Sequence, residues 1–153
     1  MQIETLGTAL IKKLEQYEVK FVFGIPGVHT VELYRGLSKG KIRHITPRHE
    51  QSAGFMADGY ARITGKPGVC FVISGPGVTN ILTAMAQARS DSIPMLVISG
   101  VNNEYDLLSM KAPLHSLPDQ SELVRQIALD SFTISDTSDL SPTIDSAFDR
   151  MNR

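Results

Sequence analysis

The sequence predicts an α/β domain, a doubly wound, mainly parallel six-stranded sheet with helices on both faces. Two observations lead to this prediction. Short runs rich in β-branched and aromatic residues alternate along the chain with longer segments whose apolar residues recur at helical spacing. Several of the short runs end directly in a glycine-rich turn, as at Gly24–Gly27 and Ser74–Asn80. Strict alternation of strand and helix is typical of a parallel sheet that helices cover on two sides.

The first part of the chain is predicted to contain two helices that alternate with two strands. Residues 3–17 carry apolar residues at helical spacing, and residues 19–23 form a short β-branched and aromatic run. A helix at 28–37 and a strand at 42–46 follow. This strand is expected to end at Thr46, because a residue before proline is pushed toward extended geometry.

The helix predicted over residues 49–64 has a glutamate in its first turn. His49 and Glu50 lie in the first turn, where a carboxylate is stabilised by the positive end of the helix dipole. Taken alone, Glu50 is interpreted as an ordinary helix-start residue. The apolar residues that share one face of this helix are Ala53, Met56, Ala57, Tyr60 and Ala61.

The second part of the chain continues the alternation. The run at 69–73 is apolar throughout, as in a strand that is buried on both faces. A polar loop at 101–118 is longer than most connections, and such loops are commonly functional or disordered. The other predicted elements are helices at 77–89, 119–127 and 140–151 and strands at 95–99 and 131–135.

Composition excludes several classes of function. At 153 residues, the chain has the size of one domain, and we treat residues 1–153 as that domain. Fifteen Lys and Arg against 16 Asp and Glu give a net charge of −1, which argues against a nucleic-acid partner or an anionic membrane surface. The single Cys70 excludes an internal disulfide and a cysteine-based metal cluster, and we predict no metal site. Without a signal peptide or an apolar run of ~20 residues, a cytoplasmic location is expected.

Three turns are expected at one edge of the sheet, where ligands of such folds bind. They are Gly24–Gly27, His49-Glu50 and Ser74–Asn80. The third turn is close to a dinucleotide-binding fingerprint, but Asn80 stands where the third glycine is needed. Asp91 also follows too soon to be the ribose-binding acid, which is expected ~20 residues further on. A dinucleotide site is therefore disfavoured.

The three turns occur in one order together with further matching segments. This set resembles the N-terminal, pyrimidine-binding domain of thiamine-diphosphate-dependent enzymes of the acetolactate synthase, pyruvate decarboxylase and benzoylformate decarboxylase group. The matching segments are Phe23–Gly27, Arg48–Gln51, Met56–Arg62, Gly65–Val69, Ser74–Asn80, and Ala88, Asp91 and Pro94 leading into Leu96–Gly100.

The resemblance implies roles for individual residues. Glu50 would hydrogen-bond N1′ of the aminopyrimidine of thiamine diphosphate and so assist removal of the C2 proton. Gly24, Pro26 and Gly27 would line the pyrimidine pocket. The residues expected to border the cleft and a subunit contact are Ser74, Gly75, Pro76 and Asn80.

Departures from the family pattern concern the substrate. Val28 stands where decarboxylases often carry a proton-transferring Asp or Ser, and Ile73 where benzoylformate decarboxylase-like chains carry His. These absences favour carboligation. His115, in a loop where acetolactate synthases tend to have Phe-Gln-Glu, is a candidate acid or base, and His29 is a weaker one. The alternative interpretation of each histidine is a loop residue with no catalytic role.

The family binds the diphosphate and Mg2+ through a separate C-terminal domain with a Gly-Asp-Gly segment, which this sequence lacks. The chain is therefore expected to be a fragment of a longer three-domain enzyme, to be inactive alone, and to act in the whole enzyme on a 2-keto acid. The resemblance also implies a homodimer or homotetramer, with small residues at the contact. These small residues are Gly54, Ala57, Gly59, Ala61, Ala84, Ala86 and Ala88.

The alternative to this interpretation is a non-catalytic nucleotide-binding or regulatory α/β module.

Overall fold

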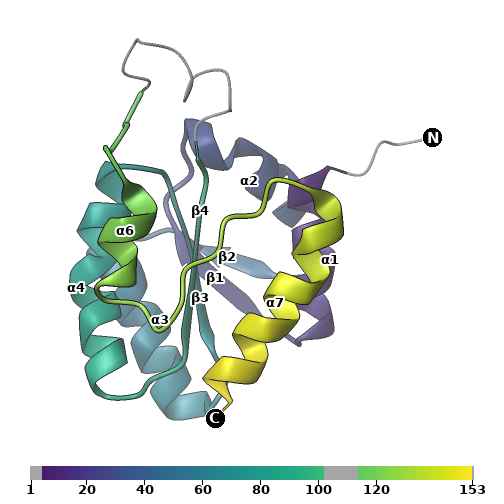
Figure 1. The fold of residues 1–153 in the computed structure, drawn as a ribbon. Coiled ribbons are helices and arrows are strands. Elements are labelled where there is room, and N and C mark those ends of the chain that lie inside the picture. The colour runs from purple at the N-terminus through teal and green to yellow at the C-terminus, as the bar shows by residue number, and fades with distance from the viewer. Residues whose placement is uncertain (1–4, 102–113, 153) are drawn as a thin grey trace.

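The computed structural model describes residues 5–101 and 114–152. Within these residues, four parallel strands form one sheet in the order β2-β1-β3-β4 (Figure 1). This confirms the α/β class and the parallel sheet, whereas the predicted count of six strands is not confirmed. The strands are β1 (Phe21–Gly24), β2 (Arg43–Ile45), β3 (Gly68–Val72) and β4 (Met95–Ser99).

Helices cover both faces of the sheet, as predicted (Figure 1). On one face lie α1 and α7 together with α2, and on the other lie α3 and α4. A 3-10 turn, η1 (Val28–Thr30), leads directly into α2. The helices are α1 (Leu6–Gln16), α2 (Val31–Leu37), α3 (Glu50–Thr64), α4 (Pro76–Ser90), α6 (Gln120–Arg125) and α7 (Thr137–Met151).

The prediction of a strand at 131–135 is wrong. These residues run between α6 and α7 without pairing to any described strand. The Phe132 residue is 46% exposed, and Ile134 packs against the core without the segment joining the sheet. Most of the predicted 101–118 loop lies outside the described residues.

The start of α7 also differs from the prediction. The helix begins at Thr137 rather than at residue 140 because the Asp136 carboxylate accepts a hydrogen bond from the Ser138 backbone N–H at 2.7 Å. A side-chain oxygen at this position satisfies an N–H that has no partner within the helix.

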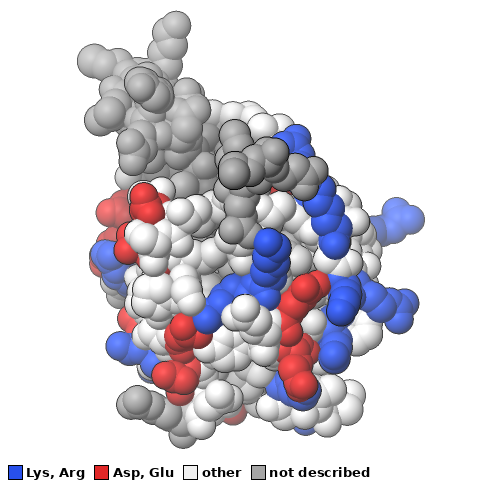
Figure 2. Space-filling model, turned by 90° about the vertical axis from the view of Figure 1, so that its right-hand side faces the viewer, with Lys and Arg blue, Asp and Glu red and all other residues white. Residues whose placement is uncertain are grey.

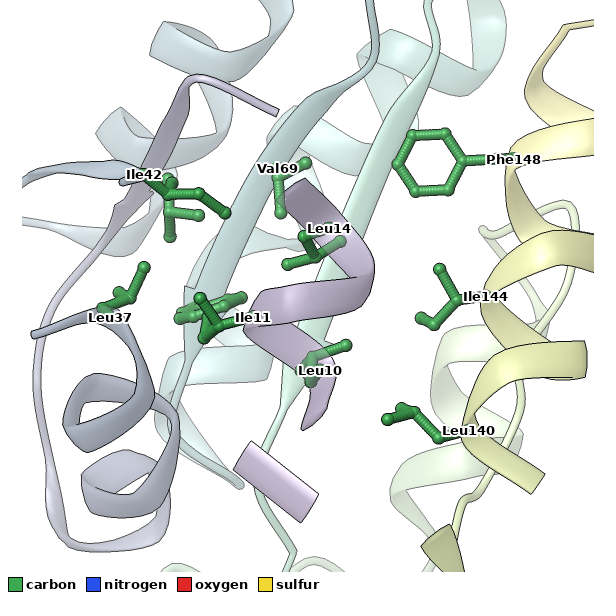
Figure 3. Packing of buried hydrophobic residues seen from close by; sticks show 11 residues of the cluster. Leu10, Ile11, Leu14, Leu37, Ile42, Val69, Leu140, Ile144 and Phe148 are labelled. Atoms are coloured by element: carbon green, nitrogen blue, oxygen red, sulfur yellow. The ribbon is translucent and has the colours of Figure 1, made fainter. Parts of the chain in front are cut away.

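Helix α1 lies at the centre of the first core (Figure 3). Leu10, Ile11 and Leu14 are 4%, 2% and 0% exposed. Figure 3 shows these side chains between Leu37 and Ile42 on one side and the apolar face of α7 on the other. That face of α7 consists of Leu140, Ile144 and Phe148.

The second core joins α3 and α4 to the sheet through small residues. A Cβ atom added at Gly54 would lie 2.4 Å from the Cβ of Ala84, so these helices approach closely only because Gly54 has no side chain. The prediction that the small residues form a subunit contact is wrong for most of them, because they pack inside the domain. The buried members are Gly54, Ala57, Ala61, Ala84 and Ala88, while Ala86 is exposed and Gly59 has open space around it.

An ion-pair network ties the C-terminal ends of α3 and α4 together. Arg62 Nε lies 2.5 Å from Asp58 Oδ1, and Arg62 Nη2 lies 2.5 Å from Asp91 Oδ2. Asp58 is buried, and Asp91 also accepts from Gln87 Nε2 at 2.9 Å. The hydrogen bonds from Arg62 hold the pKa of Asp91 below its usual range. Asp58, Arg62 and Asp91 are three of the residues that carry the sequence resemblance, and their shared contact gives them a structural role.

The surface of the α1 and α7 side carries both signs of charge. Figure 2 shows Lys and Arg interspersed with Asp and Glu on this face. One such pair is Lys13 with Asp145, whose Nζ and Oδ1 atoms are 2.6 Å apart. In the described parts of the chain, every helix is too short or too polar to cross a membrane.

Candidate functional site

The strand order places a topological switch point between β1 and β3. The turn after β1 leads to η1 and α2 on one face of the sheet, whereas the turn after β3 leads to α4 on the other. Ligands of open parallel sheets bind at the carboxyl ends of the strands on either side of such a point. The turns Gly24–Gly27 and Ser74–Asn80 follow these two strands.

The turn after β1 is held by close backbone packing and by a buried threonine. A Cβ atom added at Gly24 would lie 2.0 Å from the Phe71 carbonyl oxygen of β3. Thr30 is fully buried; its Oγ1 accepts from the Gly27 N–H at 3.1 Å and donates to the Gly27 carbonyl at 3.0 Å. The position and conformation of the turn are therefore fixed without a ligand.

His44 and Tyr34 also hold this turn, and sequence reasoning missed both. His44 Nε2 lies 2.9 Å from the Gly24 carbonyl oxygen and 3.1 Å from Tyr34 Oη. Because a carbonyl oxygen only accepts, the contact with Gly24 assigns the Nε2 proton to the histidine. Burial raises the pKa of Tyr34 well above its usual range, so its hydroxyl stays protonated. The residues lie on separate elements, and no local spacing signals their contact.

Glu50 lies in the first turn of α3, as the sequence predicted, although the helix begins at Glu50 and not at His49. His49 caps the helix: its Nδ1 accepts from the Gln51 N–H at 3.2 Å. Glu50 Oε2 accepts a hydrogen bond from Asn80 Nδ2 of α4 at 2.9 Å, and both residues are half-buried. The structure therefore brings the second and third predicted turns into direct contact.

The turn after β3 requires a glycine. Gly75 has a φ of +65°, and an added Cβ atom would lie 2.2 Å from the His115 carbonyl oxygen. The Gly75 N–H donates to Gln120 Oε1 at 2.8 Å, and Pro76 then opens α4, where a missing N–H costs nothing. The preceding Ser74 is 4% exposed, and its hydroxyl has no hydrogen-bond partner within the part of the chain that the structure describes.

The two candidate histidines lie beside each other at the same edge. The ring centroids of His29 and His115 are 5.7 Å apart. A Cβ atom added at Gly100, just after β4, would lie 2.0 Å from the His29 carbonyl oxygen. Val28 is 72% exposed and offers no group that moves a proton. The segments after β1, β3 and β4 therefore converge with residues 114–120 at one edge of the sheet.

Glu50 supplies a carboxyl group that can exchange a proton at this edge. It has one oxygen bound to Asn80 and a second that makes no hydrogen bond to a described residue. A carboxyl group can hold or transfer a proton at a ring nitrogen. Among the residues described, no group of three or more His, Cys, Asp and Glu side chains is placed to hold a metal ion.

An α/β domain with a carboxylate and glycine turns at its switch point belongs to the class of small-molecule-binding domains. Residues 4–123 match the family described as "Thiamine pyrophosphate enzyme, N-terminal TPP binding domain". The chain belongs to this family.

Individual relatives agree with the family match. The chain is 59% identical over 123 residues to a probable 2-ketoarginine decarboxylase of Pseudomonas aeruginosa, which covers 80% of this chain and 22% of that protein. It is 53% identical over 92 residues to the large subunit of acetolactate synthase isozyme 1 of Escherichia coli, covering 60% and 16%. It is 48% identical over 93 residues to the acetolactate synthase large subunit of Corynebacterium glutamicum, covering 60% and 15%. The matched region therefore spans less than a quarter of each relative.

Proposed function

We propose that this chain is the pyrimidine-binding and cofactor-activating domain of a thiamine-diphosphate-dependent enzyme that acts on 2-keto acids. In this proposal the complete enzyme is longer and has three domains, and this domain alone is inactive. The observation that carries the proposal is the position of Glu50, at the N-terminus of α3 and bonded to Asn80 beside the glycine turns. Membership of the thiamine pyrophosphate family supports it.

Glu50 would hold and release a proton at the pyrimidine ring. A carboxyl group can donate to a ring nitrogen in its protonated form and accept the proton back in its ionised form, which is general acid–base catalysis. When bound, thiamine diphosphate supplies the nucleophilic carbon for reactions of 2-keto acids. The part of this chain in that chemistry is to orient the ring and to move one proton at N1′.

The turn after β1 would receive the pyrimidine. Gly24 and Gly27 lie where a side chain would collide with Phe71 and Ile73, so the turn packs closely against β3 and the residue that follows it. Pro26 is exposed next to them and would contact the ring. The diphosphate and its Mg2+ would be held by another domain of the complete enzyme.

The substrate would meet the edge that carries the two histidines. We propose His115 as an acid or base toward the substrate and His29 as its neighbour, because their rings lie 5.7 Å apart beside Gly75 and Gly100. The relatives' names include a decarboxylase and two acetolactate synthases, so the enzyme would be a decarboxylase or a carboligase. Analysis of the products formed from a 2-keto acid with and without a second carbonyl compound separates these two reactions.

The complete enzyme would be a homodimer or homotetramer. The inward packing of the small residues leaves larger apolar side chains on the outside of α3. Phe55 and Met56 are each 43% exposed and Ile63 is 87% exposed, and such a stripe favours association. Sedimentation of the complete enzyme would test this, and a monomer at high concentration would contradict it.

Replacement of Glu50 by Gln tests the proposed role. The variant keeps the size of the side chain but removes its transferable proton. Turnover of a 2-keto acid by the complete enzyme should fall by roughly 10²-fold or more, the usual scale for loss of a general acid or base. Exchange of the cofactor's C2 proton, followed by NMR, should slow in parallel. Cofactor affinity should change much less, because one hydrogen bond contributes only about 1–3 kcal/mol.

Glu32→Gln is the matched control, because it makes the same chemical change at an exposed ion pair on α2. It should leave turnover and proton exchange unchanged. If Glu50→Gln exchanges the C2 proton as fast as the parent enzyme, Glu50 is only a helix-start residue and the proposal fails.

A further inference from the structure

Glu50 has a partner that the sequence did not connect to it. Asn80 Nδ2 donates to Glu50 Oε2 at 2.9 Å, although the two residues are thirty positions apart and lie on different helices. Both side chains are half-buried, so water competes less for this hydrogen bond than it would at an exposed site.

The chemistry of Asn80 suits a carboxyl group that must exchange a proton. An amide N–H donates to the carboxylate but carries no charge and does not titrate. A Lys or Arg at this position would instead hold the carboxylate ionised, as Arg62 does for Asp91. The amide therefore orients the carboxyl group and favours its ionised form less strongly than a charged donor would.

The packing of α3 and α4 keeps the two residues in register. Gly54 lies one helical turn after Glu50, and Ala84 lies one turn after Asn80. The helices pack tightly at these two positions, where an added Gly54 Cβ would lie 2.4 Å from Ala84 Cβ. The hydrogen bond between Glu50 and Asn80 is therefore supported by tight packing of the two helices next to it.

We infer that Asn80 is a positioning residue for Glu50: it holds Oε2 and so directs Oε1 toward the pyrimidine ring. This inference rests on the proposed function of Glu50. It replaces the sequence-based expectation that Asn80 merely borders the cleft.

The first test examines this chain without cofactor. With 13C labelling, the carboxyl signal of Glu50 is identified by its absence in Glu50→Gln. This signal should shift in Asn80→Leu, which keeps the approximate shape but removes the donor. It should not shift in Thr83→Ala, a matched control on the exposed side of α4. An unchanged Glu50 signal in Asn80→Leu would overturn the inference.

The second test measures C2-proton exchange in the complete enzyme for Asn80→Leu, Glu50→Gln and the double variant. Asn80→Leu should slow exchange about 10-fold or more, the scale of one hydrogen bond to a charged group, with cofactor affinity little changed. The double variant should be no slower than Glu50→Gln, because Asn80 acts only through Glu50. A purely structural role would instead add to the loss.

The outcomes separate the two proposals. If Glu50→Gln is slow while Asn80→Leu matches the parent enzyme, or if the two losses add, the role of Asn80 is overturned and that of Glu50 stands. If Glu50→Gln is as fast as the parent, the proposed function fails and this role fails with it. Should Asn80→Leu not fold, Asn80→Ala replaces it, since it lacks the donor and adds no bulk; it should slow exchange as well, and a rate equal to the parent's would overturn the inference.

Discussion

At the scale of single residues, Tyr17 joins the N-terminal helix to the C-terminal one. Its ring stacks on Phe148 with centroids 4.0 Å apart, and its hydroxyl donates to the Asp145 carboxylate. Lys13 Nζ also contacts Asp145, at 2.6 Å. The hydrogen bond to Asp145 raises the pKa of Tyr17 to about 12, while Lys13 and Tyr17 lower that of Asp145.

These pKa shifts predict that the stability of the fold changes with pH in the alkaline range. A group whose pKa is raised by folding stabilises the fold fully below its unfolded pKa, which is about 10 for Tyr. The contribution of Tyr17 should therefore be lost as the pH rises from 10 through about 12. Spectrophotometric titration of the parent chain and of Tyr17→Phe should assign the phenol that ionises near pH 12 to Tyr17, whereas Tyr34, whose pKa is raised by burial, should ionise late in both chains.

In Asp145→Asn, the pKa of Tyr17 should fall back toward 10, because the main cause of the shift is the hydrogen bond to that carboxylate. Ionisation of Tyr17 near pH 10 in the parent chain would contradict this account of the α1–α7 contact.

Sequence reasoning could place Glu50 but not its surroundings, for a physical reason. Its helix start follows from local signals, namely a proline at the end of the preceding strand and an apolar period. The contacts of Asn80, His44 and Tyr34 join elements that are distant in the chain, and the sequence gives no spacing from which to derive them. The histidine pair at residues 29 and 115 likewise depends on the fold.

At the scale of elements, α3 and α4 approach each other through a contact that only small side chains allow. The sequence correctly predicted that small residues on α3 permit a close helix. The prediction that these residues contact another subunit was wrong for most of them, because an apolar period does not distinguish packing within the chain from packing against another subunit. Gly54 faces Ala84 and Ile81, whereas Gly59 has open space around it.

Replacement of either of two glycines in α3 by alanine should therefore change the stability of the domain in opposite directions. Gly54→Ala should destabilise the domain by about 1–3 kcal/mol, the usual cost of overpacking, because its new Cβ meets Ala84. Gly59→Ala should stabilise it by about 0.4–1 kcal/mol, because alanine loses less backbone entropy on folding and meets no atom within 4 Å.

Urea unfolding of both variants beside the parent chain would measure these effects. Equal and small changes at the two positions would show that α3 and α4 are packed less tightly than the structure indicates.

At the scale of the whole molecule, the sequence predicted the parallel sheet, helices on both faces and the convergence of turns at one edge. The strands that are buried or paired on both sides, such as β3, were found because their apolar runs are unbroken. The predicted strand at 131–135 failed because a short local run does not show whether a pairing partner will be available. The structure therefore confirms the fold class but not the number of strands.

The isolated chain should bind thiamine diphosphate weakly. Under the proposed function its turns would contact the ring, but its described residues include no metal-binding cluster, so the charge-assisted contacts to diphosphate and Mg2+ would have to come from elsewhere. Calorimetry with the cofactor and Mg2+ should detect no tight binding to this chain. The complete enzyme, measured in the same buffer, should bind strongly.

Micromolar affinity of the isolated chain, with a stoichiometry near one, would overturn this prediction. It would mean that the turns after β1 and β3 bind the cofactor without help from another domain.

The contact between Gly54 and Ala84 also limits how related sequences can diverge. Because the space between α3 and α4 is shared by two positions, volume gained at one must be given up at the other. Related sequences that carry a larger residue at position 54 should therefore carry glycine at position 84. A larger residue at only one of these positions would push apart the helix segments that carry Glu50 and Asn80. Selection for catalytic activity would then also act on positions 54 and 84, although neither side chain would touch the substrate.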